Sequence, residues 1–502
     1  MSSLSSLPSL SSQSSPATAT GAAPVDLELN LGRLLDRNPQ LQIPRDEYNI
    51  NVTSNEGDRL DSDELAAQYG TFPGADHPAH LYFHLPLCNY ICHFCNYVKR
   101  LVPRGKEDPS LRLWSDLLIE ESRRYLERFD WIPRARIESF YIGGGTAALL
   151  LNSPEYIEPL VRHVRENYDL AAGVEFNIEG NPENFQRHHL ETAQELGFNR
   201  FSLGVQSLQD EVNDFTKRRH SAAQSIEAVE NLLATGRPFN VDMMFGLPYQ
   251  TPESVRHDMT VLTDLGVPTI TIYRLRNADR EEMGIGNRAV WNNPAVRERL
   301  ISEGRFPDLD STYAMRQEAV EVLLDKGYYP SPCGWWSRPG TYEGGNIPQT
   351  SKNKWEHYNT MIAYGPGAYG WLTGDQEEFL QTHNITDIGK YVSFMQKNEG
   401  LPLNFGRRLS GHKAIGTALG FNFKANQPIV LDRYRDRFGA DLMEMEPFAS
   451  AFTELIERGL VEMVGGGTAL KPTLDGEALH EEIIFHYFHQ RIGLSDAPVC
   501  RR

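Results

Sequence analysis

The sequence predicts an α/β protein: a partial (β/α)6 barrel followed by a mainly helical C-terminal domain. Short β-like apolar runs alternate six times with segments of helical periodicity, which is the pattern of parallel strands joined by crossover helices. Several of these runs are apolar almost throughout, as expected when helices cover the outer face of the sheet. Six strands are few for a closed eight-stranded barrel, so the barrel is predicted to be open.

The first half of the chain carries the predicted elements in order. Strands are expected at 80–85, 137–142, 173–179, 200–205, 239–245 and 268–273. The helices between them are expected at 111–126, 155–167, 188–197, 222–236 and 252–266. Ligands of such folds bind at the carboxyl ends of the parallel strands, so the functional site is expected there.

The remaining segments complete the domain organisation. The first 24 residues are Ser-rich and have nothing to bury, so they are predicted to be a disordered tail. Further helices are expected near 312–326 and from 451, where the second runs into a two-stranded wing that ends near 473. The predicted domains are the tail (1–24), an N-terminal extension (25–75), the core barrel (76–280), barrel completion and linker (281–400), and the C-terminal domain (401–490).

Composition excludes several classes of protein. The 502 residues are too many for one ordinary domain, and 18 consecutive apolar residues, as a membrane span requires, do not occur. Asp and Glu number 67 against 49 Lys and Arg, which gives a formal net charge of −18 and argues against a nucleic-acid surface over most of the chain. Five cysteines form no disulfide framework, so a reducing, cytoplasmic location is expected.

Three cysteines lie on the loop that follows the first predicted strand. Cys88, Cys92 and Cys95 have the spacing Cys-x3-Cys-x2-Cys within YFHLPLCNYICHFCNY. Three such thiolates can hold one soft metal centre, and they leave one iron of a four-iron cluster free to bind another ligand. The alternative is a structural zinc ion with His84 or His93 as fourth ligand, although zinc knuckles usually carry two Cys-x2-Cys pairs.

Other motifs lie at or near the ends of later strands. Gly143, Gly144 and Gly145 end the second strand before Thr146, and successive glycines allow a backbone to approach a ligand closely. Glu179 ends the third strand. Asp242 lies inside an apolar strand, where an unpaired carboxylate is costly.

With these motifs the chain resembles the radical S-adenosylmethionine (SAM) enzymes, and more closely their oxygen-independent coproporphyrinogen III oxidase-like branch, over roughly residues 78–470. The resemblance implies a radical SAM core barrel in which the three cysteines hold a 4Fe–4S cluster. The open iron would chelate the amino and carboxylate groups of SAM. An electron passed through the cluster would break a carbon–sulfur bond and give a 5′-deoxyadenosyl radical, which takes a hydrogen atom from substrate.

The same resemblance implies roles for single residues. Glu179 would accept hydrogen bonds from the SAM ammonium, Asp242 would contact the ribose, and Arg218, with Arg219 as the alternative, would pair with the SAM carboxylate. The segment GPGAYG (365–370) is expected to be a further backbone loop near SAM. For Tyr82 and Phe94, packing is the alternative to SAM contact. The implied cofactor-binding residues are Tyr82, Phe94, Gly144, Gly145, Thr146, Glu179, Gln206, Arg218 and Asp242.

The chain departs from the patterns of particular branch members. Position 97 is Tyr where the coproporphyrinogen oxidases proper carry a further Cys, and KNKWEHYN (352–359) only partly matches the His-Asn-x-x-Tyr-Trp-type segment of the haem chaperones. The leading hypothesis is an enzyme that uses two molecules of SAM and modifies an unactivated carbon of a tetrapyrrole or natural product by methyl or methylene transfer or by oxidation. The alternatives are a haem-binding chaperone, with His84 as a candidate ligand, and coproporphyrinogen III oxidase itself.

The expected partners are a small-molecule substrate and an electron donor such as flavodoxin or ferredoxin, with no nucleic acid and no membrane. Candidates for lining the substrate cavity are Trp335, Trp336 and Cys333, with packing as the alternative, and Cys500 is expected to be an idle thiol. Cations near the predicted barrel mouth would meet the propionates of a tetrapyrrole or would be solvated surface charges: Lys99, Arg100, Arg104, Arg274 and Arg276.

Overall fold

The computed structural model describes residues 28–41, 57–71, 78–102, 105–276, 286, 289–331, 334–340, 347–374, 378–397 and 400–490. The predicted disordered tail lies outside the described residues, as do Arg104, Cys333 and Cys500. Within the described ranges, no helix has the length and apolar character needed to cross a membrane.

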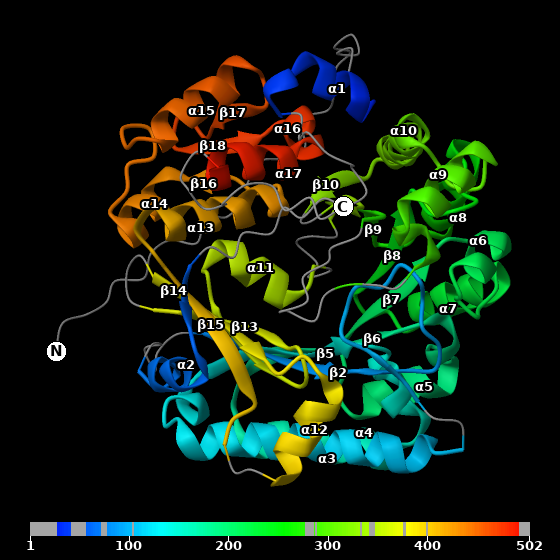
Figure 1. Cartoon of the computed structure of the whole chain (residues 1–502), viewed down its shortest axis with the longest axis vertical. Coiled ribbons are helices and arrows are strands. Elements are labelled where there is room, and N and C mark those ends of the chain that lie inside the picture. The colour runs from blue at the N-terminus through cyan, green and yellow to red at the C-terminus, as the bar shows by residue number, and fades with distance from the viewer. Residues whose placement is uncertain are drawn as a thin grey trace.

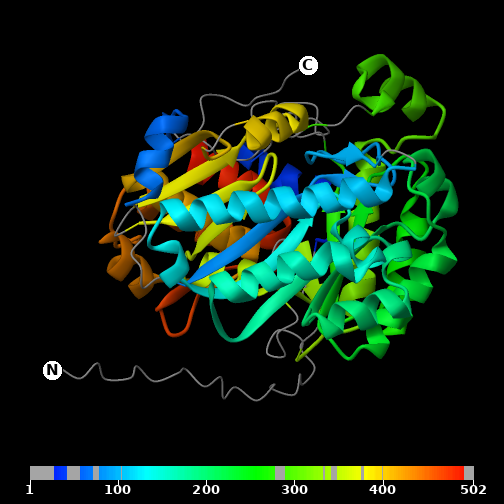
Figure 2. The ribbon, with the colours of Figure 1, turned by 90° about the horizontal axis from the view of Figure 1, so that it is seen from below.

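Six parallel strands form the centre of the fold and neighbour one another in chain order (Figure 1). They are β2 (Ala79–Leu85), β5 (Arg136–Gly144), β6 (Asp169–Gly180), β7 (Arg200–Gln206), β8 (Phe239–Phe245) and β9 (Thr269–Arg274). The helices that follow them cover the outer face of the sheet (Figure 2): α3 (Glu107–Arg128), α4 (Pro154–Asn167), α5 (Arg187–Glu195), α7 (Ala222–Ala234) and α8 (Pro252–Leu265). Each predicted strand and helix of the barrel is present near its predicted bounds, so the predicted fold class is confirmed. The short helix α6 (Asp210–Phe215) was not predicted.

The sheet continues beyond both edges of the barrel, and within the described residues it has 13 strands. On the β2 edge follow β12 (Thr360–Tyr364), β13 (Tyr369–Thr373), β14 (Glu378–Asn384), β15 (Leu403–Ser410) and β1 (Asp58–Leu60), of which only β12 is parallel to its barrel neighbour. On the β9 edge follow the antiparallel strands β11 (Trp335–Ser337) and β10 (Tyr329–Ser331). These edge strands were not predicted. Five of them have only three to five residues, too short for a clear period-two pattern, whereas β14 and β15, with seven and eight residues, were missed despite their length.

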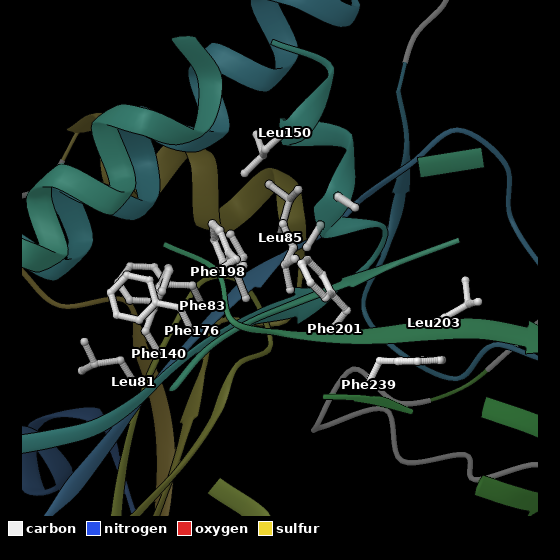
Figure 3. Close-up of a cluster of buried hydrophobic side chains, with 14 of the residues drawn as sticks. Leu81, Phe83, Leu85, Phe140, Leu150, Phe176, Phe198, Phe201, Leu203 and Phe239 are labelled. Carbon is white, nitrogen blue, oxygen red and sulfur yellow. The ribbon is translucent and has the colours of Figure 1, made fainter. Parts of the chain in front are cut away.

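Alternation along the strands separates the core from the barrel interior. Leu81, Phe83 and Leu85 of β2 point to the helix side, where Phe83 meets Phe140 of β5 with ring centroids 5.4 Å apart (Figure 3). Because successive side chains of a strand point to opposite faces, the intervening residues of β2 point into the barrel. The strands therefore supply core packing with one set of positions and interior polar groups with the other.

Helix α11 (Gln349–Glu356) closes the barrel at the amino ends of the strands. The Gln349 backbone N–H donates to Glu175 Oε1 at 2.9 Å, and the hydroxyls of Thr350 and Ser139 lie 2.8 Å apart. The Asn353 side chain donates to Glu138. Helix α11 therefore packs across the amino ends of β5 and β6, on the side opposite the carboxyl ends of the strands.

The C-terminal region is mainly helical. Its helices are α13 (Gly411–Ala425), α14 (Leu431–Phe438), α15 (Phe448–Glu457), α16 (Leu474–Ala478), α17 (His480–Ile483) and a π-helix (Ile484–Gln490). The predicted wing consists of β17 (Val461–Val464) and β18 (Ala469–Pro472), and β16 (Ile429–Val430) pairs with β18. Leucines of α1 (Leu31–Arg37) share a buried cluster with Tyr313 of α10 (Leu309–Asp325) and with this region, so α1 joins the two.

A buried carboxylate ties α3 to the edge strands. Glu121 accepts hydrogen bonds from the Gly365 backbone N–H at 2.8 Å, from the Asn384 side chain at 2.6 Å, and from the Tyr391 hydroxyl of α12 (Ile388–Lys397). Burial raises the pKa of Glu121 to about 7, against the lowering effect of these donors. The contact fixes the turn between β12 and β13 against the outer helix layer.

Replacing Glu121 with Ala is expected to lower the free energy of unfolding by about 3 kcal/mol, because three donors lose their buried acceptor. Glu127→Ala is the matched control on the same helix, since Glu127 is 61% exposed and only pairs with Arg123. Urea denaturation of both variants measures the difference. Equal losses in the two variants would contradict the structural role of Glu121.

The raised pKa of Glu121 also predicts a pH dependence. The carboxyl binds its proton more tightly in the folded chain than in the unfolded chain, so its contribution to stability is complete below pH 4.5 and is lost as pH rises through about 7. The free energy of unfolding of the wild type, relative to that of Glu121→Gln, should therefore fall between about pH 5 and about pH 7. If urea titrations show the same difference in free energy of unfolding between the two proteins across this pH range, the raised pKa of Glu121 is rejected.

Candidate active site

A cavity of about 530 Å³ opens at the carboxyl ends of the parallel strands. Its walls come from β2, the cysteine loop, and the ends of β5 to β9. The structure brings every predicted ligand and cofactor-binding residue to this one cavity: Tyr82, Cys88, Cys92, Phe94, Cys95, Gly144, Gly145, Thr146, Glu179, Gln206, Arg218 and Asp242. Their placement agrees with one shared site, while their individual roles stay predictions.

The cysteine loop is closed by its own backbone. Strands β3 (Leu87–Cys88) and β4 (Arg100–Leu101) pair in parallel, and the Val102 N–H donates to the Cys88 carbonyl at 2.9 Å. The Lys99 ammonium donates to the Cys95 carbonyl at 2.6 Å. This closure holds all three thiols on the wall of the cavity.

Burial governs the chemistry of the thiols. It raises the pKa of Cys88 to about 12 and that of Cys92 to about 11, with the other cysteines adding to both shifts and Arg218 opposing the second. Such thiols form thiolates when a bound metal supplies positive charge, as a cluster would. In the described part of the chain, no three His, Cys, Asp or Glu side chains converge to hold a single metal ion. Three thiols that share a cavity wall fit a 4Fe–4S cluster, whose irons bind separate cysteines.

The glycine loop is packed against the protein itself. The Gly145 and Thr146 N–H groups donate to the Leu85 and Leu87 carbonyls, each at 2.7 Å. A Cβ on Gly145 would lie 2.4 Å from the Leu87 oxygen, and one on Gly143 would lie 2.4 Å from Glu179 Oε2. The glycines were expected to admit a ligand, but at these two positions neighbouring protein groups already exclude a side chain.

Two half-buried carboxylates line the cavity. Glu179 accepts hydrogen bonds from the Gly144 N–H at 3.1 Å and from the Tyr141 hydroxyl, and Asp242 accepts one from the Asn240 side chain at 2.9 Å. Burial raises the pKa of both, and the charge of Asp242 raises that of Glu179 further. A cationic ligand group such as an ammonium would stabilise the charged carboxylates here.

A buried guanidinium lies beside the cysteines. Arg218 donates from Nη2 to Asn181 Oδ1 at 3.1 Å and from Nε to His220 at 2.7 Å, and its Nη1 lies 3.7 Å from the Cys92 sulfur. Arg219, the alternative in the sequence, is exposed and does not line this cavity. A zwitterion with its ammonium toward Glu179 and its carboxylate toward Arg218 is complementary to these charges.

Gln206 owes its position to an irregularity of β7. Its φ is 73°, which is the left-handed region, and the register with β8 shifts between Gly204 and Gln206. Such bulges bend a strand and redirect a side chain, and backbone strain of this kind is concentrated at functional sites.

Sequence reasoning missed several residues that line the cavity. Asn181 joins the two sides of the site, since it donates to Thr146 Oγ1 at 3.1 Å and accepts from Arg218. For three others the available signal was position, because they lie an even number of residues before a predicted site residue on the same strand. Tyr141 lies two residues before Gly143, Ser202 four before Gln206, and Asn240 two before Asp242.

Other candidates from the sequence are placed differently. His84 is no free ligand, because its Nε2 donates to the Val98 carbonyl at 2.9 Å and its Nδ1 bonds with the Tyr82 hydroxyl at 3.0 Å. Burial lowers the pKa of His84 to about 4, so the ring is neutral. His93 lies in a groove on the outer side of the cysteine loop.

The GPGAYG segment does not line the cavity. A Cβ on Gly365 would lie 2.3 Å from the His84 carbonyl oxygen, and one on Gly367 would lie 2.4 Å from Val98. The segment was expected beside SAM, but it supports β2 and the cysteine loop from behind.

The mouth of the cavity is aromatic and cationic. Tyr273 and Trp335 line it, with Trp335 Nε1 3.4 Å from the Tyr273 hydroxyl, whereas Trp336 is buried in the core. Of the predicted cations, Lys99, Arg274 and Arg276 line the cavity, and Arg100 lies in the groove on the outer side of the cysteine loop.

Comparison with known proteins agrees with this geometry. Residues 82–262 match the model of the radical SAM superfamily. The heme chaperone HemW of Lactococcus lactis is 25% identical over 385 residues, which cover 76% of this chain and 91% of the relative. The anaerobilin synthase of Escherichia coli O157:H7 is 28% identical over 322 residues, which cover 62% of this chain and 65% of the relative. The structure of coproporphyrinogen III oxidase (HemN) from Escherichia coli superposes with a TM-score of 0.68 at 20% identity, and covers 86% of this chain and 95% of that chain.

The fold and the matched domain define a radical SAM protein. Membership of this class implies that the protein binds a 4Fe–4S cluster and SAM. Over most of its length the chain is similar in sequence to a relative named a heme chaperone, and in fold to coproporphyrinogen III oxidase.

The Gly145→Ala variant is expected to lose roughly 1–3 kcal/mol of stability, because the new Cβ meets a backbone carbonyl that cannot move freely. Iron and sulfide retained per chain after anaerobic reconstitution should fall with it, since Leu87 directly precedes Cys88. Gly420→Ala is the matched control, because its Cβ would make only an ordinary contact with Ile484 at 3.6 Å. Wild-type iron content in Gly145→Ala would contradict this role of the glycine loop.

Proposed function

We propose that this chain is a haem-binding radical SAM protein that serves as a haem chaperone. The observation that carries the proposal is the lining of the cavity, which combines the aromatic rings of Tyr273 and Trp335 with the cations Lys99 and Arg276. Haem presents the complementary surface, a flat apolar ring with two carboxylates. The Lactococcus lactis relative, named a heme chaperone, supports this choice over most of its own length.

In this proposal the inner cavity holds the cofactors. Cys88, Cys92 and Cys95 would hold the 4Fe–4S cluster, which would supply one-electron reduction of SAM. Glu179 accepts from the SAM ammonium and Arg218 donates to its carboxylate, in line with their opposite charges across the cavity. Asp242, oriented by Asn240, is left to accept from the ribose.

Anaerobic titration of the reconstituted full chain with haem tests the chaperone function and should give saturable binding. Trp335→Ala is expected to weaken it by about tenfold, since an aromatic wall is lost, and Trp335→Phe should restore most of the affinity. Met463→Ala, an exposed apolar change on β17, is the control. Absence of saturable haem binding by the wild type would reject the chaperone function.

A second candidate is a radical enzyme that modifies an unactivated carbon by methyl or methylene transfer or by oxidation. It is favoured by the set of charged groups that line the cavity, because a protein that only carried haem would not require Glu179, Asp242 and Arg218 to be gathered in one cavity with perturbed pKa values. The similarity to a relative named anaerobilin synthase is consistent with it.

Product analysis tests the enzyme. With SAM and a strong reductant under anaerobic conditions, release of 5′-deoxyadenosine together with S-adenosylhomocysteine would support methyl transfer with two SAM molecules, and 5′-deoxyadenosine alone would support oxidation. Cys92→Ala should abolish cleavage of SAM yet retain haem binding. Cleavage that survives in Cys92→Ala would reject the assigned cluster site.

A further inference from the structure

Arg276 joins three parts of the molecule at the cavity. It follows the end of β9 and lines the cavity wall. Its backbone carbonyl accepts a hydrogen bond from the Asn96 side chain of the cysteine loop at 3.0 Å, and its Nη2 pairs with Glu481 of α17 at 2.5 Å. The backbone of Arg276 is therefore held by the barrel and the cysteine loop, and its guanidinium is held by the C-terminal region.

The guanidinium has donors that the described residues leave unused. Nε and Nη1 of Arg276 are buried and have no hydrogen-bond partner among them, and the side chain is only 14% exposed. Arg218, in the same cavity, differs, since its Nε and Nη2 donate to protein acceptors. Buried N–H groups are nearly always satisfied, so unsatisfied ones in a cavity wall point to an acceptor that the ligand brings.

The neighbours of Arg276 favour a planar ligand with a carboxylate. Tyr273 and Trp335 also line the cavity, and Tyr273 is on β9, three residues before Arg276. The guanidinium of Arg274 lies over the ring of Tyr313 at 5.3 Å, which directs it toward α10. A carboxylate bound at Arg276 would leave the attached ring beside the aromatic wall, close to the cysteine loop.

We propose that Arg276 binds a carboxylate of the ligand, and that this carboxylate is a propionate of a tetrapyrrole. This assignment rests on the proposed haem-binding function and gives it a specific anchoring residue. Glu481 is a positioning residue: it occupies Nη2 and leaves Nε and Nη1 for the ligand. Because Glu481 belongs to α17, the anchor also connects the bound ligand to the C-terminal region.

The experiment compares a free acid with its ester. The full-length wild type is titrated anaerobically with haem and haem dimethyl ester, and with the metal-free pair protoporphyrin IX and its dimethyl ester, in the same non-ionic detergent. The acids should bind about tenfold or more tightly than the esters, since only they offer a charged acceptor to a buried guanidinium. Arg276→Gln should lose this preference while its affinity for the esters stays unchanged.

Two further variants separate recognition from folding. Arg276→Gln leaves Glu481 without its partner, so the double variant Arg276→Gln/Glu481→Gln removes both charges and should fold while still lacking the preference. Glu481→Gln alone retains the guanidinium and should keep the preference. Arg100→Gln, on the outer side of the cysteine loop, is the control for loss of a positive charge.

The results show whether Arg276 binds a porphyrin propionate, the SAM carboxylate or neither. An unchanged preference for acids in Arg276→Gln and in the double variant overturns the anchor. Loss of SAM binding in Arg276→Gln, with the porphyrin preference intact, assigns the residue to the SAM carboxylate and also overturns the proposal. Binding of protoporphyrin IX without haem, with the preference lost in Arg276→Gln, rejects the chaperone function but keeps the carboxylate anchor. If none of the four porphyrins binds, both the function and the anchor are rejected.

Discussion

Two backbone hydrogen bonds between the end of β2 and the glycine loop set the geometry on which the cavity depends. The carbonyls of Leu85 and Leu87 accept from Gly145 and Thr146, each at 2.7 Å, so the start of the cysteine loop is fixed against the end of β5. The same loop presents the Gly144 N–H to Glu179 on β6. Three neighbouring strand ends are thereby brought into one rigid arrangement before any ligand is bound.

Support for this arrangement extends to the outer helix layer through close contacts. Glu121 of α3 holds the Gly365 N–H, Gly365 lies against the His84 backbone, and the His84 ring lies against Gly144. A side chain on either glycine would collide with His84, at 2.3 Å for Gly365 and 2.5 Å for Gly144. The contacts explain why His84 is buried, neutral and fully hydrogen-bonded. The residue packs between the edge strands and the cavity, and the hydrogen bonds of its two ring nitrogens hold it there.

The sequence was informative where chemistry and periodicity coincide. Strands of six to twelve residues between amphipathic helices revealed the barrel. Distinctive residues at strand ends, such as Glu179 and the glycine loop, had to meet because parallel strands end at one edge. The sequence did not predict the role of a residue when that role depends on a partner far away in the chain. Nothing near His84 indicates that Val98 accepts its proton, and nothing near Arg276 indicates its pairing with Glu481, more than two hundred positions later.

The two cavity guanidinium groups illustrate how one cavity separates two ligands. Arg218 is held by protein acceptors and lies 3.7 Å from the Cys92 sulfur, so the carboxylate it can bind must lie next to the cysteines. Arg276 stands at the end of β9 with unused donors, beside aromatic rings. A ligand that filled both positions would need two carboxylates and an ammonium to satisfy Glu179 as well. In the proposed function, a small zwitterion next to the cysteines would pair with Glu179 and Arg218, and a larger flat acid would pair with Arg276.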